Sequence, residues 1–311
     1  MSSHGAGSHG VSVIIPARNA GAFLREALDS VFIQGLADPE VIVVDDGSED
    51  DTAAVARSYG RGVMTLSQPR SGSGRARNRG IEASSGRLLA FLDADDLWVP
   101  EKSRLQLPVL EADPRLGLVF SDMVAFSGEG EAVRTYWQGR GFDGGCSLSS
   151  IFLYDMISTP TVVMRREVLD AVGGFDETLP IGQDTDLWFR VAMKYPFALV
   201  DRPLVRRRFH GGNVTRDSRL LARCVVEIWG RYLEPCIEAE PHLKQRLLDD
   251  FARIRWNHLF EEGCSLLREG NPREARRRFG EAIGVAPFRP RPYAFWVASL
   301  LAAGGADGRR R

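Results

Sequence analysis

Short apolar runs rich in β-branched residues recur along the first 120 residues, and helical patterns separate them. Five runs have the length and composition of a buried strand: Val11–Ile15, Val41–Val44, Val63–Leu66, Leu88–Leu92 and Leu116–Phe120. From Phe23 to Phe32, apolar residues recur every three or four positions, which is the spacing of one helix face. Strands that alternate with helices predict an α/β fold with a mostly parallel sheet flanked by helices.

The pattern changes after about Thr215, where glycine becomes sparse and helix-forming residues dominate. We therefore expect a disordered tail over residues 1–10, an α/β domain over residues 11–215 and an all-helical extension over residues 216–311. Within the extension, one set of spacings resembles a tetratricopeptide helix pair: Gly263, Leu266, Ala275, Phe279, Ala282 and Pro287. A plain helical hairpin explains these spacings equally well.

Acidic residues directly follow two of the predicted strands. Asp45 and Asp46 end the second strand, and Asp93 and Asp95 follow the fourth. Parallel strands bind ligands at their carboxyl ends, so these acids are expected at one edge of the sheet. Asp46 can accept hydrogen bonds from a base or a ribose. Asp93 and Asp95 can hold Mg²⁺ or Mn²⁺ together with phosphate oxygens.

Three further residues carry candidate chemistry. Arg77 lies among glycines and arginines at a predicted helix start, where both the guanidinium group and the helix N-terminus favour phosphate. Asp184 opens an amphipathic helix and is either an N-cap or a general base for a hydroxyl nucleophile. His210 precedes two glycines and is either a loop residue or a contact to metal or phosphate.

Two local patterns indicate helix or turn caps. Ser48, with Asp51 three residues later, indicates a capping box for the helix after the second strand. Asp96 indicates a cap for the turn that follows it.

Taken in order, these motifs resemble glycosyltransferase family 2, the inverting enzymes of the GT-A fold. The series runs through Val11–Asn19, Val43–Ser48, Ala76–Gly80, Phe91–Trp98, Gly173–Glu177 and Gln183–Trp188. The resemblance covers about residues 11–213. It implies a nucleotide-sugar donor, a glycan, lipid-linked or other hydroxyl acceptor, and Mn²⁺ or Mg²⁺ as cofactor. Most members have Glu before the catalytic Asp, whereas this chain has Gln183.

The resemblance also implies roles for single residues. Asp184 is expected to be the catalytic base. The residues expected to bind the nucleotide are Pro16, Ala17, Asn19, Asp46, Arg77 and Asp93. Asp95 and His210 are expected at the metal. The expected acceptor-side residues are Gly174, Phe175 and Trp188. The activity implied is inverting sugar transfer in polysaccharide or glycoconjugate synthesis.

The net charge of the chain and its distribution indicate which classes of binding partner are expected. The chain has 40 Lys and Arg against 41 Asp and Glu, a net charge of −1, which disfavours a general nucleic-acid binder. Residues 1–204 hold 19 basic and 28 acidic side chains, a net −9, whereas residues 205–311 hold 21 and 13, a net +8. A basic helical extension predicts peripheral contact with an anionic membrane, through Ala294–Leu301 and Arg309–Arg311.

Cysteine content and hydropathy predict a location. No apolar run reaches the roughly 18 residues needed to span a bilayer. The four scattered cysteines favour reduced thiols. We therefore expect a cytoplasmic protein, with the inner face of the membrane as the site of any membrane contact.

Two other functions are also compatible with the sequence. A sugar-nucleotidyltransferase also uses a parallel sheet, aspartates and a metal, but Pro16–Asn19 stands where its glycine-rich signature is expected. A non-catalytic nucleotide-sugar-binding or scaffold protein would work through the helical extension. Loss of the key acids would favour it, and they are all present.

Overall fold

The computed structural model describes residues 10–127, 131–135, 145–155, 157–210 and 218–307. The chain divides into two compact units, Met1–Asn213 and Val214–Arg311. Within the described ranges, no helix has both the length and the apolar character needed to cross a membrane. The expected tail at residues 1–9 and the terminal Arg309–Arg311 lie outside the described residues.

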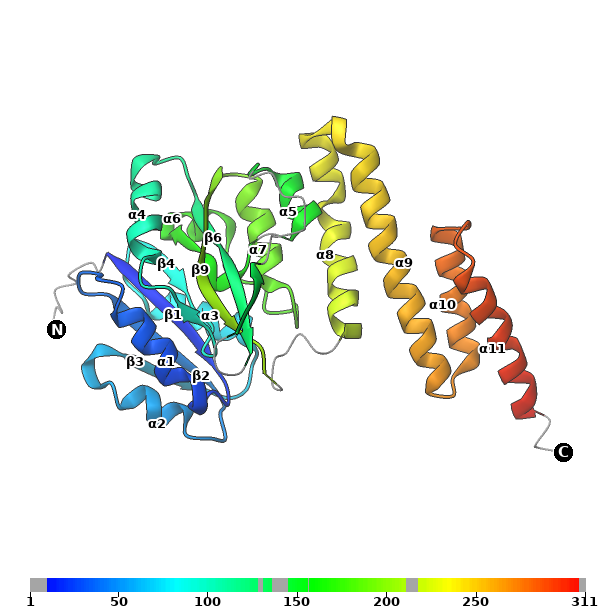
Figure 1. The fold of residues 1–311 in the computed structure, drawn as a ribbon, viewed down its shortest axis with the longest axis horizontal. Coiled ribbons are helices and arrows are strands. Elements are labelled where there is room, and N and C mark those ends of the chain that lie inside the picture. The colour runs from blue at the N-terminus through cyan, green and yellow to red at the C-terminus, as the bar shows by residue number, and fades with distance from the viewer. Residues whose placement is uncertain (1–9, 128–130, 136–144, 156, 211–217, 308–311) are drawn as a thin grey trace. The chain divides into compact units, whose positions relative to one another are not determined.

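The first unit is built on one sheet with helices packed against it (Figure 1). The strand order is β3-β2-β1-β4-β8-β6-β9-β5, and β7 pairs with β6. The strands are β1 (Val11–Ala17), β2 (Glu40–Asp46), β3 (Met64–Gln68), β4 (Leu88–Phe91), β5 (Leu97–Trp98), β6 (Leu118–Ser127), β7 (Glu131–Thr135), β8 (Val163–Arg165) and β9 (Phe197–Arg208). The helices are α1 (Gly21–Phe32), α2 (Thr52–Arg57), α3 (Ser73–Ala83), α4 (Lys102–Ala112), α5 (Leu148–Tyr154), α6 (Arg166–Val172) and α7 (Gln183–Ala192), with 3-10 turns η1 (Gly60–Gly62) and η2 (Thr159–Thr161).

Both faces of the central strands are buried, which explains their continuous apolar sequence. In β2, Val41 and Val43 join the core cluster that contains α1, whereas Ile42 and Val44 pack with Ala76 of α3 on the other face. Successive side chains of a strand point to opposite faces, so a strand covered on both sides is apolar at every position.

The sheet is parallel across β3-β2-β1-β4 and mixed beyond. Strand β8 runs antiparallel to both of its neighbours, β4 and β6, and β6 pairs in parallel with β9. The α/β class predicted from the sequence is confirmed, and the parallel pattern holds for the half of the sheet built from the first four apolar runs. The fifth run, Leu116–Phe120, belongs to β6 and adds no further parallel neighbour to β4, because the short β8 inserts between them.

The predicted capping box at Ser48 is wrong. Helix α2 begins at Thr52, and its first N–H groups are satisfied by Asp50, whose Oδ1 accepts from Thr52 N at 3.0 Å. Ser48 Oγ instead accepts a hydrogen bond from Asn19 N at 3.0 Å. The serine therefore joins the loops after β1 and β2 and does not cap a helix.

The second unit is helical throughout its described residues. It contains α8 (Ser218–Ala239), η4 (Pro241–Leu243), α9 (Lys244–Arg268), α10 (Pro272–Val285) and α11 (Arg291–Asp307). A core cluster joins α9 and α10 through Trp256, Leu259, Phe260, Ala275, Phe279 and Ala282. A Cβ at Gly263 would stand 2.6 Å from Phe279 Cε1, so glycine permits the close approach of these helices. A helical hairpin is thus present, and its resemblance to a tetratricopeptide pair stays a prediction.

Candidate active site

The carboxyl ends of β1, β2 and β4 lie at one edge of the sheet. The register pairs Ala17 of β1 with Asp45 of β2, and β4 runs parallel to β1. The residues that follow these strands therefore converge, as the strand order predicts. Pro16 is half-buried at this edge, and Ala17 is 3% exposed, so Ala17 can offer a ligand little beyond its backbone.

Asn19 connects the loops after β1 and β2. Its φ of 49° is left-handed, a conformation that asparagine tolerates better than most residues. Its Oδ1 accepts from Glu49 N at 2.9 Å, alongside the Asn19 N to Ser48 Oγ bond. The two loops are thereby held together at the end of the sheet where the nucleotide is predicted.

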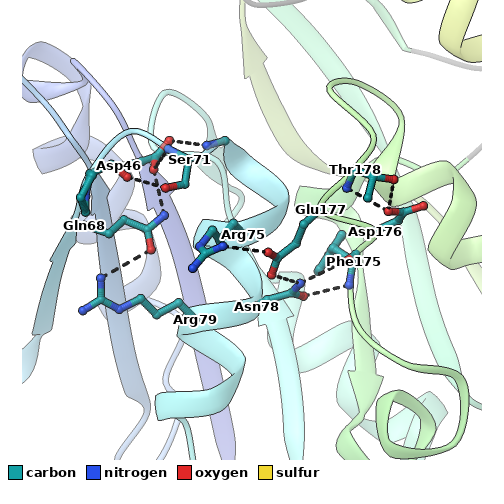
Figure 2. A network of polar contacts seen from close by, with 12 residues as sticks. Asp46, Gln68, Ser71, Arg75, Asn78, Arg79, Phe175, Asp176, Glu177 and Thr178 are labelled. Atoms are coloured by element: carbon teal, nitrogen blue, oxygen red, sulfur yellow. Dashed lines mark hydrogen bonds and ion pairs between the residues drawn. The ribbon is translucent and has the colours of Figure 1, made fainter.

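Asp46 organises the glycine-rich loop before α3. Its Oδ1 accepts from Gln68 Nε2 at 2.8 Å and from Ser71 N at 2.7 Å, and its Oδ2 accepts from Gly72 N at 2.9 Å (Figure 2). The side chain is buried. Asp46 thus binds the N–H groups of Ser71 and Gly72, which lie just before the first residue of α3, Ser73.

Arg77 supports Asp93 and does not face solvent. Its Nη2 lies 2.6 Å from Asp93 Oδ1, and its side chain is 8% exposed against 35% for Asp93. The guanidinium group lies over the Phe175 ring, 5.4 Å from its centroid. Arg77 is therefore a buried side chain that pairs with Asp93, the more accessible partner, and its expected place near the nucleotide stays a prediction.

Three carboxylates, those of Asp93, Asp95 and Asp96, lie close together in the segment after β4. Burial, followed by the nearby charge of Asp93, raises the pKa of Asp95, and His210 Nε2 lies 2.9 Å from Asp95 Oδ2. Burial also raises the pKa of Asp96 well above its ordinary value, with Asp93 and Asp95 adding to the shift. Asp96 is no turn cap, because β5 follows it and its Oδ1 accepts from Arg208 N at 2.9 Å.

The side chains of Asp95 and His210 suit a divalent cation whose remaining ligands come from a substrate. In the described parts of the chain, no group of three or more His, Cys, Asp and Glu side chains could hold a metal by itself. Asp95 and His210 bring one carboxylate and one imidazole nitrogen together. Mg²⁺ is commonly bound through one or two carboxylates plus substrate phosphates, so this incomplete set fits a metal that arrives with a diphosphate.

Asp184 lies in the first turn of α7. The helix follows Gly182, whose φ of 82° is left-handed, so the N-cap interpretation of Asp184 is wrong. Its two oxygens accept from different donors: Oδ2 from Thr159 Oγ1 at 2.7 Å and Oδ1 from Thr185 N at 2.9 Å. The side chain is half-buried, which leaves it accessible to a ligand.

Two of the three expected acceptor-side residues are buried. Phe175 and Trp188 are 3% and 1% exposed, and their rings pack edge to face at 6.3 Å. Their side chains therefore support the loop from behind and offer no surface to an acceptor. Gly174 is exposed, and a Cβ there would stand 2.5 Å from Asn78 Oδ1.

Asn78 fixes the backbone of this loop to α3. Its Nδ2 donates to Phe175 O at 2.9 Å, and its Oδ1 accepts from Phe175 N at 2.8 Å (Figure 2). Asn78 Nδ2 also donates to Glu177 Oε1 at 2.9 Å. Because Arg77 precedes Asn78, α3 contacts Asp93 with one residue and the 173–177 loop with the next.

The structure also explains why this chain has Gln183 where most members of the family have Glu. Its Nε2 donates to Leu179 O at 2.7 Å, and the side chain is buried against Gly74. An ionised glutamate accepts hydrogen bonds and cannot donate, so it could not make this contact. The amide thus closes the turn that leads into α7 and places Asp184.

The sheet and its flanking helices place the protein in the α/β class of the GT-A fold, and comparison with known proteins specifies the family. The family model described as "Glycosyl transferase family 2" matches residues 12–173, more than half of the chain. The protein therefore belongs to glycosyl transferase family 2, and it is a glycosyltransferase.

Relatives and solved structures agree with this assignment. The uncharacterized glycosyltransferase RP339 of Rickettsia prowazekii is 28% identical over 233 residues, covering 74% of this chain and 73% of that protein. Three other Rickettsia relatives are longer, and the chain spans 34% to 39% of their length. S. aureus TarS 1-349 in complex with UDP-GlcNAc matches with TM-score 0.67 and 20% identity, over 92% of this chain and 83% of that one. The mannosyltransferase PcManGT from Pyrobaculum calidifontis, with GDP-Man and Mn2+, matches with TM-score 0.60 and 18% identity, over 94% and 85%.

Proposed function

We propose that the protein transfers a sugar from a nucleoside diphosphate donor to a hydroxyl acceptor with inversion, using Asp184 as general base. The observation that carries the proposal is the state of Asp184: half-buried, with each oxygen held by one donor. A general base must be held in place and still have lone pairs for the proton that it abstracts. Asp93, whose carboxylate is accessible, and Asp95, which lies buried beside it, are the acids proposed for the side of the site that binds the nucleotide sugar.

The reaction then follows from these side chains. An acceptor hydroxyl donates to Asp184 and loses its proton to the carboxylate as its oxygen attacks the anomeric carbon. The bond from that carbon to the diphosphate oxygen breaks, and its electron pair leaves with the nucleoside diphosphate. Because the attack is a single displacement from the opposite face, the anomeric configuration inverts. Asp93, oriented by Arg77, binds the donor's nucleoside portion.

We further propose Mn²⁺ or Mg²⁺ as cofactor, held by Asp95 and His210 together with donor phosphates. When bound, the ion would offset charge on the leaving diphosphate. Support comes from the geometry: Asp95 Oδ2 and His210 Nε2 lie 2.9 Å apart, and Asp93 and Asp96 add negative charge close to Asp95, which a bound cation would offset. A mannosyltransferase neighbour was also solved with Mn2+.

The proposal is tested by measuring product formation with UDP-GlcNAc and GDP-Man as first donors, since similar structures contain them. Release of nucleoside diphosphate, in the presence of simple glycan acceptors and Mn²⁺, identifies sugar transfer, whereas release of pyrophosphate from a nucleoside triphosphate would identify the nucleotidyltransferase alternative. NMR of the first product reports the anomeric configuration. Asp184→Asn is expected to abolish transfer, and wild-type rates in this variant contradict the assignment of the base.

We also propose a cytoplasmic enzyme that meets an anionic membrane through its C-terminal helices, for acceptors in polysaccharide or glycoconjugate synthesis. The four cysteines, all within the described residues, form no disulfide. Phe288 is 98% exposed, and Tyr293, Trp296 and Val297 of α11 are at least 36% exposed, next to exposed Arg289. Exposed aromatic residues beside arginine suit a membrane interface. Cosedimentation with vesicles of anionic and of neutral lipids tests this, and equal absence from both contradicts it.

A further inference from the structure

A buried threonine holds the carboxylate that we propose as the base. Thr159 is 2% exposed, and its Oγ1 donates to Asp184 Oδ2 at 2.7 Å. Thr185 N donates to the other oxygen at 2.9 Å. Together these two hydrogen bonds fix the plane of the carboxylate. An ionised carboxylate accepts at about four positions, so each oxygen keeps a lone pair for an acceptor hydroxyl.

The turn that carries Thr159 is itself fixed. In η2, the backbone N of Thr161 donates to Ser158 O at 2.9 Å, a contact that does not depend on the Thr161 side chain. Gln106 Nε2 of α4 donates to Thr161 O at 2.8 Å. The Thr159 hydroxyl therefore cannot drift away from Asp184 without breaking contacts to another element.

The same turn is connected to the segment that carries the acidic motif. Trp98 Nε1 donates to Pro160 O at 3.0 Å, and Trp98 stands only three residues after Asp95. Thr159 precedes Pro160 directly. A short path of covalent and hydrogen bonds thus leads from the donor-side acids, through Trp98 and η2, to Asp184.

We infer that Thr159 is a positioning residue for the base: it orients the Asp184 carboxylate toward the acceptor. The inference rests on the proposed function, because it requires Asp184 to be the base. Correct placement of a reacting group contributes to the chemical step rather than to the binding of the donor. Loss of the hydroxyl therefore affects proton removal and leaves donor binding intact.

The test compares four variants of the full chain. Thr159→Val removes the hydroxyl with little change of shape, and Thr159→Ser retains it. Thr161→Val is the matched control, because Thr161 is a buried threonine in the same turn whose hydroxyl bonds to Ser158 O and not to Asp184. Asp184→Asn reports on the base itself. For each variant, kcat, the KM of the acceptor and the Kd of the nucleoside diphosphate are measured.

Thr159→Val is expected to lower kcat roughly 10- to 100-fold, as misplacement of a reacting group does. Nucleoside diphosphate affinity stays within about twofold of wild type, while Thr159→Ser and Thr161→Val keep the wild-type kcat. If Thr159→Val does not fold, Thr159→Ala against Thr159→Ser makes the same comparison.

The outcomes separate this inference from the function on which it rests. An inactive Asp184→Asn together with a wild-type kcat in Thr159→Val overturns the positioning role alone. Equal losses in Thr159→Val and Thr161→Val also overturn it, because they would assign the effect to the turn. Full activity of Asp184→Asn overturns the base and the positioning role together.

Discussion

At the scale of single residues, the carboxylates of the site differ in how many donors hold them. Asp46 accepts three hydrogen bonds and is 5% exposed, whereas Asp184 accepts two and is half-buried. A carboxylate whose acceptor positions are mostly used by the protein organises its surroundings. One with free lone pairs can take part in chemistry. Asp46 therefore shapes the loop before α3, and Asp184 remains able to accept a proton.

Asp46→Asn is expected to destabilise the protein by about 1–3 kcal/mol and to weaken nucleoside diphosphate binding. The amide keeps one acceptor oxygen, so Ser71 N or Gly72 N loses a partner. Chemical unfolding and calorimetric titration measure the two effects. Asp45→Asn is the control, since Asp45 accepts from Ser48 N in the neighbouring loop. Equal effects of both substitutions on binding would contradict a specific role for Asp46.

Lys102 is expected to make stability depend on pH. Burial lowers its pKa from 10.5 to about 7, while its Nζ lies 4.4 Å from the centroid of the Trp98 ring. Between these pH values the unfolded chain binds a proton that the folded protein does not. The free energy of unfolding therefore rises with pH there, by at most roughly 1.4 kcal/mol per pH unit.

Lys102→Met removes the titrating group and keeps most of the volume. Relative to this variant, the wild type is expected to be least stable below pH 7 and to gain stability as the pH rises toward 10.5. Urea unfolding of both proteins at pH 6, 8 and 9 measures the difference. A difference that is constant across these pH values would show that the lysine is charged in the fold.

At the scale of elements, close approach of backbones decides where helices and loops can lie. Gly263 lets α9 approach Phe279 of α10, and Gly174 lets its loop approach Asn78 of α3. In both places the space for one Cβ is already filled. Substitutions at such positions force neighbouring groups to move, which commonly costs about 1–3 kcal/mol.

Gly263→Ala is expected to lower the stability of the helical hairpin by about 1–3 kcal/mol, because the new Cβ would overlap Phe279. Gly284→Ala in α10 is the control, since nothing lies within 4 Å of its Cβ position. Alanine there is expected to stabilise the helix by up to about 1 kcal/mol. Circular dichroism during thermal unfolding compares them. The same sign of change in both variants would contradict the packing argument.

The elements and acids could be predicted from the sequence, whereas the contacts between them could not. Each of the five apolar runs overlaps a strand (β1, β2, β3, β4 and β6), whereas the short β5 was not predicted; Asp93 and Asp95 follow their strand as expected. The contact between Thr159 and Asp184 could not be predicted, because the two residues lie 25 positions apart and no local sequence pattern indicates such a pair. The burial of Arg77 against Phe175 arises in the same way, from contacts that only the folded chain forms.

At the scale of the whole molecule, folding and ligand binding are linked. A ligand that binds only the folded state stabilises it by about 2.7 kcal/mol at a concentration 100 times its Kd. A nucleoside diphosphate with Mn²⁺ is therefore expected to raise the Tm of the wild type. Asp95→Ala is expected to remove the part of the increase that depends on Mn²⁺. An unchanged metal-dependent increase in this variant would contradict the proposed ligand. Glu167→Ala serves as the control, because Glu167 is an exposed carboxylate on α6.

The antiparallel strand β8 also has a consequence for synthesis of the chain. Strands β1 to β4 are complete by residue 91, but the neighbour that covers the edge of β4 comes from Val163–Arg165, more than 70 residues later. During synthesis, the edge of the parallel half of the sheet at β4 therefore stays unpaired until β8 is translated. Strand β6 can pair with its long-range partners β8 and β9 only after those strands are translated. Unpaired strand edges recruit other chains. The interval between the translation of β4 and β8 is thus the period in which a nascent chain of this enzyme most needs protection from its neighbours.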